Sequence, residues 1–124
     1  MAKKILLVDD SATVLMMERM ILAPERFEIV TACNGQEGFE RAKAERPDLI
    51  LMDVVMPKMN GIQTCKALRE DADTRDIPII LVTTRGEAET MEQGFDSGCN
   101  DYVTKPVNSA ELLAKVRSVL GASK

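Results

Sequence analysis

Short, mostly continuous apolar runs alternate along the chain with longer stretches in which apolar residues recur every three or four positions. Such runs are typical of strands buried on both faces of a parallel sheet, and the longer stretches have the period of helices with one apolar side. The pattern predicts strands at residues 5–8, 27–32, 48–53, 77–84 and 101–106, and helices at residues 11–23, 36–45, 62–71, 87–98 and 108–120.

Residues that favour helix starts and turns lie at the predicted boundaries. Ser11 is suited to cap the first helix, and Asn108 or Ser109 can cap the last one. Asn34-Gly35 marks a turn between the second strand and the second helix.

Five strand–helix units in alternation predict a parallel sheet that is covered on both faces and joined by right-handed crossovers. The sequence has no linker, repeat or low-complexity segment. We therefore expect one doubly wound α/β domain over residues 1–124, with a five-stranded parallel sheet.

The first predicted helix is unusual, because residues 14–17 are apolar all round one turn. One or two of these side chains must therefore face solvent or a partner. We nevertheless expect most of the methionine surface on this helix, from Met16, Met17 and Met20, to be buried or half-buried, since methionine fills gaps in a core.

Composition and charge exclude several classes of protein. The chain has 124 residues, of which 45% are hydrophobic and 29% are charged, a globular balance. The net charge of −4 lacks the basic excess of a nucleic-acid binder, and no apolar run approaches the roughly 18 residues of a membrane span. The apolar stretch after "MAKK" is too short for a signal peptide. We expect a cytoplasmic protein with no nucleic-acid partner and no membrane insertion.

The chain has no histidine, and its three cysteines, Cys33, Cys65 and Cys99, are far apart and form no CxxC pair. We therefore expect neither a zinc site nor a mechanism that uses an imidazole base. The cysteines are expected to be small, reduced residues of the core.

Polar residues follow the apolar runs at the predicted strand ends. In a parallel sheet these ends share one edge, where open α/β sheets bind ligands. The residues at this edge are Asp9, Asp10, Asp53, Thr83, Thr84 and Lys105. Each alone has an ordinary explanation as a turn former, a strand residue or a surface charge, so the prediction of a site depends on their convergence.

Three carboxylates cannot lie together in ionised form without a cation, and a single lysine supplies too little positive charge. Oxygen ligands suit Mg²⁺, and a carboxylate, a hydroxyl, an ammonium and Mg²⁺ together are suited to stabilise a phosphoryl group. Asp53 is the best candidate for a nucleophile, because it stands alone at the end of its strand and is central in chain order.

Four separated motifs resemble, in their order, those of the receiver domains of two-component signalling. They are Asp9-Asp10 after "ILLV", "DVVMPKMNG" from Asp53 to Gly61, "VTT" at 82–84 and "YVTKP" at 102–106. The resemblance covers nearly the whole chain and implies the flavodoxin-like strand order 2-1-3-4-5. It also implies a signalling domain that is not a turnover enzyme and that promotes its own aspartyl phosphorylation and dephosphorylation.

The resemblance implies Mg²⁺ as the cofactor and gives Asp53 the role of phosphate acceptor. Asp10 would ligate Mg²⁺ directly, and Asp9 would do so directly or through a water molecule. Asp53 and the backbone carbonyl of Val55 would complete the protein ligands.

The resemblance also assigns roles on the last two strands. Lys105 would pair with a phosphoryl oxygen, and Thr83 would hydrogen-bond the phosphoryl group after phosphorylation. Tyr102 would be the switch aromatic, which turns inward as Thr83 moves. The Lys105–Pro106 peptide bond is typically cis in the family.

Three further positions are expected to modulate the site. Val55 and Arg85 lie where the family varies and where residues tune the lifetime of the phosphate. Because an apolar Val55 cannot position an attacking water, we expect slow to moderate self-dephosphorylation. Thr84 stands where the family usually has a smaller residue, and it would narrow access to Asp53.

The implied partners are a histidine kinase or histidine phosphotransfer domain, for which the first helix is a candidate docking site, and a downstream target protein. The target would bind the surface formed by residues 88–102 and 109–120. Only "GASK" follows the last predicted helix, so we expect a stand-alone receiver domain without an output domain. Its output would be a protein contact, as in chemotaxis or motility control, or a phosphorelay.

Two other classes of function share parts of this pattern. A Mg²⁺-dependent aspartyl-phosphate phosphatase usually has a second aspartate two residues after the first, where this chain has Val55. A flavodoxin-like cofactor binder would need a Ser/Thr/Gly-rich phosphate cradle after the first strand and more aromatic residues than the 3% present.

Overall fold

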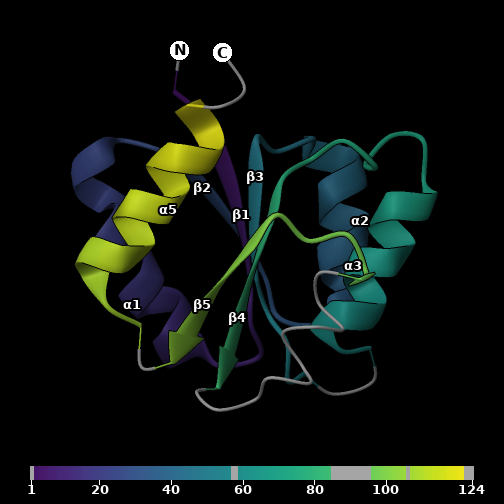
Figure 1. Ribbon diagram of the computed structural model, residues 1–124, viewed down its shortest axis with the longest axis horizontal. Helices are drawn as coiled ribbons and strands as arrows, with labels where there is room; N and C mark the ends of the chain where they lie inside the picture. The colour runs from purple at the N-terminus through teal and green to yellow at the C-terminus, as the bar shows by residue number, and fades with distance from the viewer. Residues whose placement is uncertain (1, 57–58, 85–95, 106, 122–124) are drawn as a thin grey trace.

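The structure, a computed structural model, describes residues 2–56, 59–84, 96–105 and 107–121. Its five strands form one sheet in which every neighbouring pair is parallel, in the order β2-β1-β3-β4-β5 (Figure 1). The strands are β1 (Lys4–Val8), β2 (Glu28–Ala32), β3 (Leu49–Asp53), β4 (Ile79–Thr84) and β5 (Asp101–Lys105). The predicted flavodoxin-like fold is confirmed.

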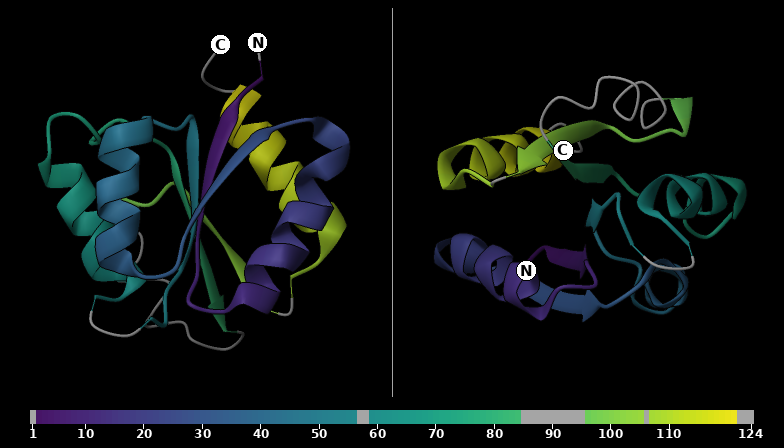
Figure 2. Two further views of the ribbon diagram at one scale, coloured as in Figure 1. Left: turned by 180° about the vertical axis from the view of Figure 1, so that it is seen from behind. Right: turned by 90° about the horizontal axis from the view of Figure 1, so that it is seen from below.

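Helices cover both faces of the sheet. The helical segments are α1 (Ala12–Leu22), the 3₁₀ turn η1 (Ala23–Glu25), α2 (Gly35–Glu45), α3 (Gly61–Glu70) and α5 (Ser109–Gly121). α1 and α5 lie on one face, and α2 and α3 lie on the other (Figures 1 and 2). The helix predicted at residues 87–98 falls mostly outside the described residues.

Two apolar clusters, one on each side of the sheet, take alternate residues of each strand. Ile5 and Leu7 of β1 face α1 and α5, whereas Leu6 and Val8 face α2 and α3. All four side chains are buried, which explains why the strand is a continuous apolar run.

Each of the four α-helices in the described ranges begins with a polar side chain that accepts a hydrogen bond from a backbone N–H three residues later. Ser11 accepts from Val14, Asn34 from Glu37, Asn60 from Gln63 and Asn108 from Glu111. Ser11 therefore caps α1 as predicted. Asn34 starts α2, so the predicted turn at Asn34-Gly35 is the first turn of a helix.

The expectation that the methionines of α1 are buried is wrong. Met16, Met17 and Met20 are 56, 47 and 68% exposed. The physical reason is the rotation of α1 about its own axis, which turns Glu18 and Leu22 toward the sheet. The helix has more apolar residues than its inward side can hold, so the methionines face outward.

The expectation of a buried cysteine is wrong for Cys33, whereas Cys65 and Cys99 are buried free thiols as expected. Cys33 lies in the turn between the edge strand β2 and α2. Its backbone N–H donates to Glu37 Oε1 at 2.8 Å, and its side chain is outside the core.

The segment between β3 and α3 returns to the sheet at Gly61. The N–H of Gly61 donates to the carbonyl oxygen of Val54 at 2.9 Å. A Cβ at this position would meet the backbone oxygen of Asp53, so only glycine allows the approach. The start of α3 is thereby held against the end of the strand that carries Asp53.

Replacing Asn60 by alanine should lower the free energy of unfolding by about 1–2 kcal/mol, because the cap of α3 is lost. Asn60 and Gln63 form a reciprocal capping box, with N···O distances of 2.9 and 2.8 Å. Urea unfolding followed by circular dichroism measures the loss. The control Gln63→Ala keeps the N-cap hydrogen bond to Asn60 Oδ1 and removes only the bond that the Asn60 backbone N–H donates to the Gln63 side chain, so it should cost less. A wild-type midpoint for Asn60→Ala would contradict the prediction.

Candidate functional site

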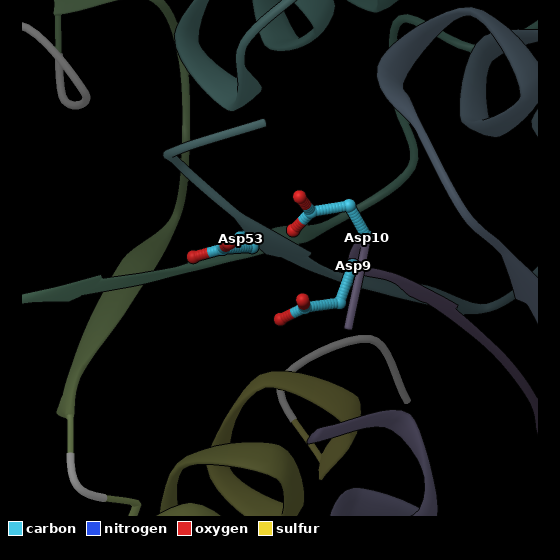
Figure 3. A group of neighbouring side chains, drawn as sticks. All are labelled: Asp9, Asp10 and Asp53. Atoms are coloured by element: carbon cyan, nitrogen blue, oxygen red, sulfur yellow. The ribbon is translucent and has the colours of Figure 1, made fainter. Parts of the chain in front are cut away.

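Three aspartates and one lysine meet at the carboxyl edge of the sheet. Asp9 and Asp10 follow β1, Asp53 ends β3 and Lys105 ends β5. The three carboxylates lie side by side in Figure 3, and one oxygen of each lies within 4.8 Å of the others. The structure thus brings together four of the residues that the sequence placed at this edge.

The alternation of strand residues places Asp9, Asp53 and Lys105 on the same face of the sheet. Each comes two positions after a residue of the apolar cluster that packs against α1 and α5. These preceding residues are Leu7, Leu51 and Val103. Asp10 is out of this phase and is exposed.

The ammonium of Lys105 is the cation that the described contacts place among these carboxylates. Its Nζ lies 3.0 Å from Asp53 Oδ1 and 3.9 Å from Asp9 Oδ2. Both aspartates are buried, whereas about a third of the lysine side chain is exposed, at 32%. Two buried carboxylates therefore depend on one partly solvated ammonium.

The electrostatics reflect this imbalance. Burial raises the pKa of Asp53, the contact with Lys105 opposes the shift, and the charge of Asp10 adds to it. Burial also raises the pKa of Asp9. Burial pulls the pKa of Lys105 down, but the hydrogen bond and charge of Asp53, together with the charges of Asp9 and Glu18, outweigh it and leave that pKa raised. The site favours additional positive charge.

The donor set fits a hard divalent cation. Three carboxylate oxygens from two strands converge, and such ligands suit Mg²⁺. Asp9 Oδ2 is buried and has no hydrogen-bond partner among the described residues, so it is available to a cation. Asp9 Oδ1 has a second task, because it accepts the N–H of Ser11 at 2.9 Å at the start of α1.

Thr83, Thr84 and Val55 are predicted site residues that are not part of the cluster of three aspartates and Lys105. Thr83 is buried, one position beyond the Val82 that pairs with Asp53, and the alternation puts it on the face of α2 and α3. Val55 has an exposed side chain, and its backbone hydrogen bond lowers the pKa of Asp53. Thr84 pairs in register with Lys105.

Tyr102 is not part of the acidic cluster. Its side chain is half-buried against the apolar residues on the α2 and α3 side of the sheet. The Lys115 Nζ of α5 lies 4.9 Å from the centroid of its ring. The same nitrogen donates to the Tyr102 carbonyl oxygen at 2.6 Å and lies 3.3 Å from Asp101 Oδ1. Arg85 and the Lys105–Pro106 bond lie outside the described residues.

Sequence reasoning missed one residue beside the site, Glu18 of α1, which is only 2% exposed. Its Oε1 is buried without a hydrogen-bond partner in the described structure. Burial raises the pKa of Glu18 to about 8, with repulsion from Asp9 and Asp53 adding to the shift and Lys105 opposing it. The signal was present, because Glu18 lies four residues before Leu22, within the predicted apolar stripe.

A doubly wound parallel sheet with a cluster of carboxylates and a lysine at its carboxyl edge defines a flavodoxin-like protein with an acidic site that could hold a cation. Comparison with known proteins makes the class specific. The chain belongs to the response regulator receiver domain family, whose family model matches residues 5–117. It is therefore a receiver domain of two-component signalling, and such domains are signalling domains rather than classical enzymes.

Individual relatives agree with this assignment. Protein PilH of Pseudomonas aeruginosa is 40% identical over 94% of this chain and 97% of its own length. The chain spans about half the length of other curated relatives, 48% of the regulator RpaA of a Synechocystis strain and 50% of PhoP of Bacillus subtilis. Within the described residues, no helix has the length and apolarity needed to cross a bilayer.

Solved structures share the fold closely. A putative response regulator from Chloroflexus aurantiacus superposes with a TM-score of 0.94 at 31% identity, covering 98% of this chain and 99% of that one. The receiver domain of the sensor histidine kinase PA1611 from Pseudomonas aeruginosa has a TM-score of 0.89 at 27% identity, with 98 and 99% coverage. That structure has a magnesium ion coordinated in its active-site cleft.

In the metal-free protein, Glu18 should make the free energy of unfolding fall as the pH rises from 4.5 to about 8. Over this window the unfolded chain ionises Glu18 while the folded chain keeps it neutral, so the folded state binds more protons. Glu18→Gln removes the titration, and its stability relative to wild type should rise across the window by on the order of 4 kcal/mol.

Urea unfolding in EDTA at a series of pH values measures this difference. The control Glu40→Gln changes an exposed side chain of α2 and should follow the wild-type profile. Parallel profiles for Glu18→Gln and wild type would show that Glu18 ionises as freely in the folded chain as in the unfolded one.

Proposed function

We propose that this receiver domain is a phosphoryl-accepting switch in which Asp53 takes a phosphoryl group from a histidine kinase or histidine phosphotransfer partner, with Mg²⁺. The observation that carries the proposal is the 3.0 Å contact of Lys105 Nζ with Asp53 Oδ1 at an edge that also holds Asp9 and Asp10. Membership of the receiver family and the magnesium ion in a related receiver domain support it.

The transfer forms one bond and breaks one. A carboxylate oxygen of Asp53 attacks phosphorus, and the bond from phosphorus to the imidazole nitrogen of the donor breaks, with the electron pair leaving on the imidazole. Such transfers depend mainly on positioning and on neutralising charge. Lys105 would move its ammonium from the free carboxylate to a phosphoryl oxygen, since that group carries more negative charge.

The cation site would be built from this chain's own oxygens. Asp10 would bind the ion directly, Asp9 directly or through water, and Asp53 and the Val55 carbonyl would complete the protein ligands. When bound, Mg²⁺ would supply the positive charge that a single lysine does not. The buried, unpaired Asp9 Oδ2 supports this assignment.

The response would pass to the surface through β4 and β5. Thr83 would hydrogen-bond the phosphoryl group, and Tyr102 would turn inward as Thr83 moves. Both side chains lie on strands that pair directly, β4 with β5, which supports a coupled movement. The readout would be a change in the surface of residues 88–102 and 109–120, of which 96–102 and 109–120 are described.

The donor partner would dock on α1. The N-terminal end of α1 follows shortly after Asp9 and Asp10, so a donor bound at Asp53 would lie next to this end of the helix. Exposed Met16 and Met20 line a hollow of about 510 Å³ beside it. An apolar patch of this kind suits the helical face of a phosphotransfer partner.

We propose that the surface of residues 88–102 and 109–120 contacts a target protein. The output would serve chemotaxis, motility control or a phosphorelay. Whether residues 1–124 act as a stand-alone domain stays a prediction. The exposed Val55 beside Asp53 offers no group to orient water, which supports slow to moderate loss of the phosphate and argues against a turnover phosphatase.

Acetyl phosphate or beryllofluoride should modify the protein once per chain in the presence of Mg²⁺ and not in EDTA. Asp53→Asn should abolish the adduct, which intact-mass spectrometry or ¹⁹F NMR detects. Asp76→Asn, an exposed aspartate in the loop before β4, is the matched control and should react like wild type. Metal-independent labelling, or multiple turnover of small phosphate esters, would contradict the proposal.

A further inference from the structure

Glu18 is a buried acid that the proposed phosphoryl chemistry leaves without a task. It lies on the inward side of α1, and helical side chains lean toward the N-terminal end of their helix. For α1 that end is the carboxyl edge of the sheet, where Asp9 is found. The Glu18 side chain therefore leans toward the acidic site from the helix side, and its Oε1 has no hydrogen-bond partner among the described residues.

The charges that act on Glu18 are those of the site itself. After burial, the groups that shift its pKa are Asp9, Lys105 and Asp53. The coupling is mutual. Burial lowers the pKa of Lys105, the two aspartates raise it, and the charge of Glu18 adds a smaller rise. Glu18 thus belongs electrostatically to the same face as these three side chains, which the strand alternation also indicates.

The Lys105 ammonium has three protons to donate, and Asp53 Oδ1 at 3.0 Å is its closest described partner. Two buried carboxyl oxygens on this side of the sheet are unpaired among the described residues. They are Asp9 Oδ2, at 3.9 Å, and Glu18 Oε1. An unpaired buried acceptor is costly, and both of these would be satisfied by one ammonium that moved from Asp53 toward α1.

We propose that Glu18 is a positioning residue for Lys105, and that Glu18 Oε1 and Asp9 Oδ2 form a second resting place for its ammonium. The inference rests on the proposed function of the site. In the ion-free protein the ammonium pairs with Asp53. When a divalent cation binds the aspartates, the ammonium withdraws toward Glu18, because two positive groups compete for the same carboxylate.

The inference explains why an acid is kept where an apolar side chain would pack better. A buried carboxyl without a partner destabilises the fold, and an apolar residue of similar size would remove that cost. If Glu18 serves the site, replacing it should make the fold more stable and the cation site weaker. A purely structural role would give losses of stability instead.

The test is Glu18→Met, which keeps the length of the side chain and removes both oxygens. In EDTA its melting temperature should rise above that of wild type. Its Mg²⁺ affinity, measured by isothermal titration calorimetry with Mg²⁺ alone, should fall about fivefold, within the range of coupling between neighbouring groups. Glu18→Gln keeps one acceptor oxygen and should recover part of the affinity. Glu45→Gln, on α2, is the control and should bind Mg²⁺ like wild type.

A double-mutant cycle shows whether the effect passes through Lys105. In a Lys105→Met background there is no ammonium to move, so adding Glu18→Met should leave the Mg²⁺ affinity unchanged. The same loss in both backgrounds would mean that Glu18 acts on the cation directly, and it would overturn the inference. Wild-type affinity in both Glu18 variants would overturn it as well.

Failure of this inference is separable from failure of the proposed function. A wild-type chain that forms the Mg²⁺-dependent beryllofluoride adduct on Asp53, with an affinity for Mg²⁺ that Glu18 does not influence, refutes only the role of Glu18. A wild-type chain that binds no Mg²⁺ and forms no adduct refutes both.

Discussion

One ammonium group joins the two buried carboxylates on which the site is built. Lys105 is on β5 and Asp53 is on β3, so the side chain must reach across β4. Two strand spacings are about 10 Å, a separation that a long, flexible lysine bridges and that shorter polar side chains do not. The strand order therefore favours a long cationic side chain, and the parallel direction of the strands brings both ends to the same edge.

Much of this arrangement follows from the sequence by general rules. Continuous apolar runs specify strands buried on both faces, and alternation with helical stretches specifies a parallel sheet, as β1 and β3 illustrate. Asp9, Asp53 and Lys105 could then be placed at one edge without knowing the order of the strands. The order itself came from a resemblance of motifs, because hydrophobic patterning does not determine which strand neighbours which.

The failures of sequence reasoning concern the rotation of a helix and the packing at its face. Four apolar residues in succession on α1 leave its inward side ambiguous, and the structure turns Met16 and Met17 outward. Burial of Glu18 was missed because charged residues are expected outside unless they are paired. The helical spacing of Glu18 indicates the buried side of α1, but only the structure shows that Asp9, Asp53 and Lys105 act on its charge.

The contact between Lys115 and the Tyr102 ring links the residue that we propose as the switch to the charge of the outer surface. The ammonium is held by the ring, the Tyr102 carbonyl and Asp101, and the last two do not depend on the position of the ring. An inward turn of Tyr102 would thus leave Lys115 in place while stripping away its aromatic cover. A binding partner would then meet a more exposed ammonium group on α5. The change at the surface would thus be one of exposed charge as well as of shape.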